Sequence, residues 1–151
     1  MMGQGKNHLE DLDSQKSLIF AEEPEEDPFP ITCAQWNSLK NNFLAFGSTS
    51  VLLVDVGKNV ENPTIMEIGG KNPHEGSYVT SVAWNNEVNY IFASAGENGV
   101  IALWDIKKND SIFQFKDGVA SSGNARRNVT VAWSKSIATQ IAVALDDEKK
   151  N

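Results

Sequence analysis

Three copies of one short segment constrain the fold more than any other feature of the sequence. Each copy is centred on a tryptophan, at Trp36, Trp84 and Trp133, and these tryptophans lie 48 and 49 residues apart. The segments around them read CAQWN, SVAWN and TVAWS, and a second set follows in the same order: FLAFGS (43–48), IFASAG (91–96) and IAVALD (141–146). The first two copies add a third set, VLLVDVG (51–57) and IALWDIK (101–107). Self-similarity at a fixed period of this length predicts a repeat architecture.

The repeated segments are expected to be β-strands. They are short, rich in Val, Ile, Thr and aromatic residues, and bounded by Asn, Gly and Ser. The pair Asn98-Gly99 predicts a tight two-residue hairpin in which both residues have positive φ. Because VIALWDI has apolar residues at successive positions, not at helical spacing, it is expected to be buried on both faces. Small antiparallel sheets bury both faces by stacking, so the sequence predicts an all-β chain of propeller-like blades.

Charge and repeat spacing together divide the chain into four parts. Residues 1–30 hold two lysines and eight acids, whereas the remainder is close to neutral. We therefore expect an acidic, disordered leader at 1–30, followed by repeats at 31–78 and 79–128 and a partial repeat at 129–151. The near-neutral folded part predicts no binding to nucleic acid or to an anionic membrane.

The strand segments resemble a known repeat family. VTSVAW, IFASAGENG and VIALWD are similar, in order, to the first three strands of a WD-repeat β-propeller blade. The resemblance implies an incomplete propeller of about two and a half blades, with His74 as a displaced counterpart of the family's histidine and Glu97 or Asn98 in the following turn. Apolar stacking is expected to be the main stabilising interaction. The structural repeat signature comprises Trp36, Asp55, Trp84, Asn98, Gly99, Trp104, Asp105 and Trp133.

Residues 31–151 also resemble a narrower family, the larger outer-coat subunit of the COPII vesicle coat (the Sec-thirty-one type). The matching positions in the second unit are Trp84, Asn85, Val88, Ile91, Ala93, Ser94, Ala95, Trp104, Asp105, Lys108 and Asn109. In the third unit they are Ala132, Trp133, Ala138, Thr139, Gln140, Asp146 and Asp147. The triplet Ala138-Thr139-Gln140 is the most distinguishing part, because it lies outside the general blade pattern. The resemblance places the chain over the middle blades, so we expect a piece of a longer propeller or a truncated gene model.

Few residues suggest catalysis or metal binding. Cys33 and His74 could form a nucleophile–base or metal pair only with a third group, which the spacing does not supply. GGKNPHEG lacks the spacing of a phosphate-binding loop, and Arg126-Arg127 is expected to lie in a solvated loop. All four tryptophans are expected to lie in the core. No catalytic residue, cofactor site or metal site is predicted, and the chain is not expected to be an enzyme.

The resemblance implies a scaffold of the COPII outer coat, acting in transport from the endoplasmic reticulum to the Golgi. The implied protein partners are the smaller WD-repeat outer-coat subunit and the inner-coat complex, with no nucleic acid and with membrane contact only through the coat. The implied location is cytoplasmic, at endoplasmic reticulum exit sites and on coated vesicles. Two alternatives stay open: a generic WD-repeat adaptor, such as a substrate receptor or signalling scaffold, and a hydrolase built on a β-propeller.

Overall fold

The chain forms three antiparallel sheets. The computed structural model describes residues 30–57, 61, 63–68, 70–116 and 126–146, and the described residues contain strands and no helix. The first sheet contains β1 (Cys33–Trp36), β2 (Phe43–Gly47), β3 (Val51–Asp55) and β4 (Thr64–Glu67). The second contains β5 (Val79–Trp84), β6 (Ile91–Gly96), β7 (Val100–Asp105) and β8 (Asp110–Lys116). The third pairs β9 (Arg127–Trp133) with β10 (Ile141–Asp146).

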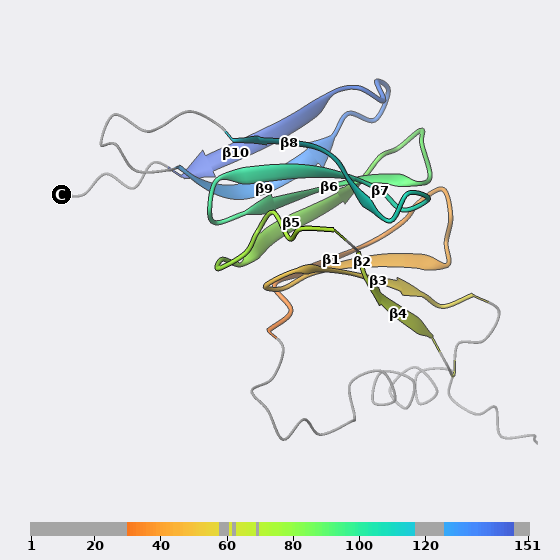
Figure 1. Ribbon diagram of the computed structural model, residues 1–151. Coiled ribbons are helices and arrows are strands. Elements are labelled where there is room, and N and C mark those ends of the chain that lie inside the picture. The colour runs from red at the N-terminus through yellow and green to blue at the C-terminus, as the bar shows by residue number, and fades with distance from the viewer. Residues whose placement is uncertain (1–29, 58–60, 62, 69, 117–125, 147–151) are drawn as a thin grey trace, which may run out of the picture.

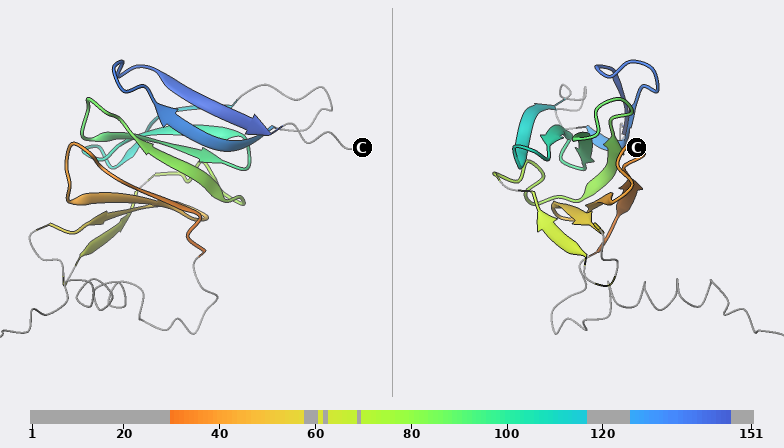
Figure 2. Two further views of the ribbon diagram at one scale, coloured as in Figure 1. Left: turned by 180° about the vertical axis from the view of Figure 1, so that it is seen from behind. Right: turned by 90° about the vertical axis from the view of Figure 1, so that its right-hand side faces the viewer.

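The sheets are stacked in sequence order, with the second sheet between the other two (Figure 1, and from behind in Figure 2). In the two four-stranded sheets, each strand pairs with the next one along the chain. The first strands of the sheets lie next to one another, because β5 contacts both β1 and β9. The prediction of an all-β chain built from stacked small sheets is therefore confirmed.

Two apolar layers fill the spaces between the sheets. The layer between the first and second sheets holds Phe43, Ala45, Val51, Leu53, Ile68, Val79, Val82, Trp84, Phe92, Ala102 and Trp104. The layer between the second and third holds Ala83, Ala93, Ala95, Ile101 and Val131, with Leu103, Phe115, Trp133, Ile141 and Val143 packed against it. Alternate residues of the second sheet enter opposite layers, which explains why its strands are apolar at successive positions.

The predicted two-residue hairpin at Asn98-Gly99 is wrong in detail. β6 ends at Gly96 and β7 begins at Val100, so the loop holds three residues. The amide of Gly99 donates a hydrogen bond of 3.0 Å to the carbonyl of Gly96. Gly99 has a φ of 80°, and the only non-glycine residue with positive φ in the described part of the chain is Asn109. This is the three-residue hairpin loop in which a single left-handed glycine follows a turn, so only one of the two predicted residues needs positive φ.

The expectation that all four tryptophans lie in the core is wrong for Trp36. Trp84 and Trp104 are buried, at 3% and 2% exposed, and Trp133 is half-buried, whereas Trp36 is 52% exposed. Trp36 lies on the face of the first sheet that points away from the second sheet, so no neighbouring sheet covers it in the described part of the chain. The leader at 1–30 lies outside the described residues except for residue 30, and the repeat boundaries at 78 and 128 stay predictions.

Candidate interaction surface

Cys33 and His74, the two residues weighed for catalysis, have different neighbours. Burial raises the pKa of the Cys33 thiol, and hydrogen bonds from Thr32 and from the amides of Gly47 and Val82 only partly oppose this shift. Because a raised pKa keeps the sulfur protonated, it disfavours a nucleophilic role. Among the described hydrogen bonds, the His74 ring is joined to Ser94 and not to the thiol.

A buried polar chain crosses the second sheet. Trp104 on β7 donates from Nε1 to the Ser94 hydroxyl on β6 at 2.8 Å, and the same hydroxyl is hydrogen-bonded to Nε2 of His74 at 2.7 Å. Nδ1 of His74 makes no hydrogen bond of standard geometry. Burial lowers the pKa of His74 to about 4, and the nearby Asn98 side chain opposes this only in part. The ring is therefore neutral at pH 7 and acts as a structural group within the sheet.

This polar chain modifies the expectation that apolar stacking is the main stabilising interaction. In the second sheet the stacking is accompanied by hydrogen bonds from three buried side chains. The first sheet cannot form the same chain, because Phe46 takes the place of Ser94 and Val54 that of Trp104. The displacement of His74 from the family position obscured the contact in the sequence, since the residue reaches Ser94 through a loop between the two sheets.

The two aspartates of the repeat signature stabilise turns. Asp105 is 6% exposed, and its Oδ1 accepts a hydrogen bond from the Lys107 amide at 2.9 Å. Asp55 accepts from the Gly57 amide at 2.8 Å and from the Asn42 side chain at 2.6 Å. Each carboxylate thus satisfies a free backbone amide just after the third strand of its sheet, which is a structural role.

The second and third sheets each bond to the sheet before them through a tryptophan. Nε1 of Trp84 donates to the Gln35 carbonyl at 3.0 Å, and Nε1 of Trp133 donates to the Ala83 carbonyl at 2.8 Å. The two acceptors hold equivalent positions, one residue before the tryptophan of the preceding sheet. Trp36, the third member of the series, is the exposed one.

Asparagines at the ends of β1 and β5 form a second set of bonds between sheets. Nδ2 of Asn37 donates to the Asn89 carbonyl at 2.7 Å, and Nδ2 of Asn85 donates to the Ala138 carbonyl at 2.8 Å. Both side chains are buried, and their Oδ1 atoms also accept amides of the turn that follows. Sequence analysis did not select these residues for a role, although the repeated dipeptide Trp-Asn contained the signal.

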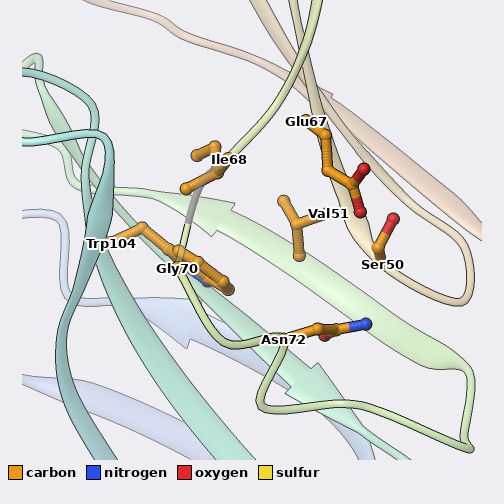
Figure 3. A pocket seen from close by; sticks show the side chains of 7 residues that line it. All are labelled: Ser50, Val51, Glu67, Ile68, Gly70, Asn72 and Trp104. Atoms are coloured by element: carbon orange, nitrogen blue, oxygen red, sulfur yellow. The ribbon is translucent and has the colours of Figure 1, made fainter.

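A cavity of about 270 Å³ opens between the first and second sheets. Its lining residues are Ser50, Val51, Glu67, Ile68, Gly70, Asn72 and Trp104. Figure 3 shows Ser50, Val51 and Glu67 on one side of the opening and Trp104 on the other. Glu67 is the only charged group in the lining, and it is exposed. The described residues contain no group of three or more His, Cys, Asp or Glu side chains that could hold a metal ion.

Comparisons with known proteins agree with this geometry. No family model matches the chain. The chain is 29% identical over 136 residues to the zebrafish (Danio rerio) protein transport protein Sec31A, covering 88% of the chain and 10% of that protein. It is 30% identical over 138 residues to protein transport protein SEC31 of Dictyostelium discoideum, covering 90% of the chain and 10% of that protein. The chain thus spans about a tenth of the length of these relatives.

Solved structures place the stacked sheets among β-propellers. A chain of the outer-coat vertex of COPII assembled on membranes superposes with a TM-score of 0.66 at 26% identity, covering 76% of this chain and 31% of that one. The β-propeller domain of Cps50 (Swd1) from Myceliophthora thermophila superposes with a TM-score of 0.57 at 18% identity, covering 82% of this chain and 35% of that one, and supports the fold alone. The fold is an open, incomplete β-propeller. The resemblance to the larger COPII outer-coat subunit, inferred from the residues, is confirmed. No helix in the described part of the chain is long and apolar enough to cross a membrane.

Proposed function

We propose that this chain is a non-catalytic structural component of the COPII outer coat, in which its propeller blades present loops and strand edges to other coat proteins. The observation that carries the proposal is the superposition on the COPII outer-coat vertex, joined to sequence similarity with Sec31 proteins over about nine-tenths of the chain. At 26% identity to a chain of that vertex, the similarity extends beyond the fold.

The geometry of the chain suits a scaffold. The buried polar side chains described above form hydrogen bonds within or between the sheets. The described residues outside the contacts between sheets provide turns and exposed strands. By similarity, the partners are the smaller WD-repeat outer-coat subunit and the inner-coat complex. The chain would then act in the cytoplasm, on vesicles leaving the endoplasmic reticulum, and would reach the membrane only through the coat.

Affinity capture of the tagged full-length chain from cells tests the proposal, with an unrelated WD-repeat propeller carrying the same tag as the control. Enrichment of outer-coat subunits over the control is the expected result. Recovery of no coat component would overturn the proposal, and stable capture of a different complex would favour the generic adaptor. Fluorescence of the tagged chain at endoplasmic reticulum exit sites provides a second readout.

A further inference from the structure

The cavity between the first and second sheets has an apolar wall. Val51, Ile68 and Trp104 line it, and each of these residues is at most 6% exposed. The volume of about 270 Å³ lies just below the roughly 300–1,000 Å³ of small-molecule pockets, so the cavity suits a single inserted side chain. The cavity lies between two four-stranded sheets that pack against each other, so its shape does not depend on the outer faces of the first and third sheets.

One nearly buried hydroxyl in the lining has no hydrogen-bond partner. Ser50 is 7% exposed, and its hydroxyl makes no hydrogen bond in the described part of the chain. The side chain of Asn72, by contrast, is already engaged: Nδ2 donates to the Thr49 carbonyl at 2.8 Å, and Oδ1 accepts from the His74 amide at 2.9 Å. Because buried polar groups are normally paired, the Ser50 hydroxyl is available to a polar group that enters the cavity.

Two carboxylates lie beside the cavity. Glu67 is part of its lining and is exposed (Figure 3). Asp110, at the start of β8, is also exposed, and its carboxylate lies against the lining residue Gly70, where an added Cβ would collide with it. Neither carboxylate forms a salt bridge with another described residue. Lys71 follows Gly70 in the sequence but does not line the cavity. The cavity therefore combines an apolar wall with two negative charges that have no cationic partner.

We propose that this cavity binds an arginine side chain from an extended segment of a partner protein. Arginine has an apolar stem and a charged head, so the stem packs against the apolar wall while the guanidinium stays near Glu67 and Asp110. The planar guanidinium carries five N–H donors, which allows it to bond to a carboxylate and to the Ser50 hydroxyl at the same time. A neutral apolar side chain would leave that hydroxyl without a partner and would gain nothing from the two charges. The site adds a peptide contact to the proposed coat function and lies between two blades.

Titration of the isotope-labelled full-length chain with a short peptide tests the proposal by nuclear magnetic resonance. The probe is the pentapeptide Gly-Gly-Arg-Gly-Gly with both ends blocked. Saturable shifts of the backbone amides of Val51, Ile68 and Asn72 are the expected result. A peptide with citrulline in place of arginine has nearly the same shape without the charge, and should bind at least ten-fold more weakly. Lysine in the same place should bind several-fold more weakly, because it lacks the planar donor set. Leucine should give no saturable shift.

Substitutions in the chain locate the site. Glu67→Gln and Asp110→Asn each remove one negative charge at an exposed position, so both variants should keep the wild-type circular dichroism spectrum. Each should weaken binding of the arginine peptide at least three-fold. Glu75→Gln is the matched control: it makes the same change at an exposed residue in the loop between β4 and β5, outside the lining, and should leave binding unchanged.

Several results would overturn the proposal. These are a lack of saturable shifts at the cavity with tens of millimolar peptide, equal binding of the arginine peptide and its citrulline or leucine counterpart, and an equal loss of binding in Glu75→Gln and Glu67→Gln. The last result would mean that the peptide is attracted only by the overall negative charge of the chain. None of these results bears on the proposed coat function, because that function is tested by capture from cells.

Discussion

The indole of Trp104 donates a 2.8 Å hydrogen bond to the hydroxyl of Ser94 inside the second sheet. The two residues lie on neighbouring strands, and both are almost fully buried. Ser94 is also bonded to His74, so a single hydroxyl satisfies two buried ring nitrogens. The buried centre of this blade therefore depends on one small polar side chain, and this dependence can be measured.

Ser94→Ala should lower the free energy of unfolding by about 2 kcal/mol or more, because it leaves Trp104 Nε1 and His74 Nε2 buried without a partner. Urea unfolding followed by tryptophan fluorescence measures the change. Ser111→Ala on the outer strand β8 is the matched control, since its hydroxyl accepts a hydrogen bond from the exposed Gln114 side chain, and should change stability by less than about 0.5 kcal/mol. Equal losses for the two variants would show that the hydrogen bonds among Trp104, Ser94 and His74 contribute nothing to the free energy of unfolding.

The stability of the protein should fall as the pH drops from about 6.5 to about 4. Burial holds the pKa of His74 near 4, whereas in the unfolded chain it lies near 6.5. Between these values the unfolded chain binds the proton and the native state does not, so the free energy of unfolding decreases with falling pH. The contribution of His74 is fully present above pH 6.5, and its loss amounts to about 3 kcal/mol at most. Urea midpoints across this range should slope less steeply in His74→Gln, and an unchanged slope would contradict the assignment.

Gly99→Ala should be more destabilising than Gly76→Ala. Both glycines have positive φ, 80° and 76° respectively, so both substitutions strain the backbone. An added Cβ at Gly99 would also lie 2.6 Å from the Arg126 carbonyl, whereas one at Gly76 would meet nothing within 4 Å. We expect a loss of about 1 kcal/mol for Gly76→Ala and a larger one for Gly99→Ala. Thermal unfolding of the two variants side by side separates the effect of the steric clash from that of the backbone strain. A smaller loss of stability for Gly99→Ala than for Gly76→Ala would contradict the prediction.

The sequence predicted the stacked strands well, because burial on both faces leaves an apolar run that spacing alone reveals. It predicted the hairpin between β6 and β7 less well, since Asn-Gly suits both a two-residue loop and the three-residue loop that is present. The exposure of Trp36 could not be read from local sequence, because Trp36, Trp84 and Trp133 have nearly identical neighbours. Only their place in the stack differs.

The hydrogen-bonded side chains of the second sheet show a different limit of prediction from sequence. Ser94 and Trp104 are fixed by strand register, but His74 reaches them from a loop whose path depends on the packing of the whole sheet. Asn37 and Asn85, which join the sheets, could not be assigned that role from the sequence for a related reason. A single Asn after a strand indicates a turn, and its second bond to the next sheet becomes visible only when the sheets are placed against each other.

Cys33 should react with a thiol probe several-fold more slowly in the native protein than in the unfolded chain. Burial raises the pKa of its thiol, and the sulfur lies close to Gly47 on the side of the first sheet that faces the second, so both thiolate formation and access are reduced. Timed labelling at pH 8 with and without urea measures the ratio, and Cys33→Ser provides the blank. Rapid labelling of the native protein would reopen the hydrolase interpretation, because an activated nucleophile must be both accessible and readily ionised.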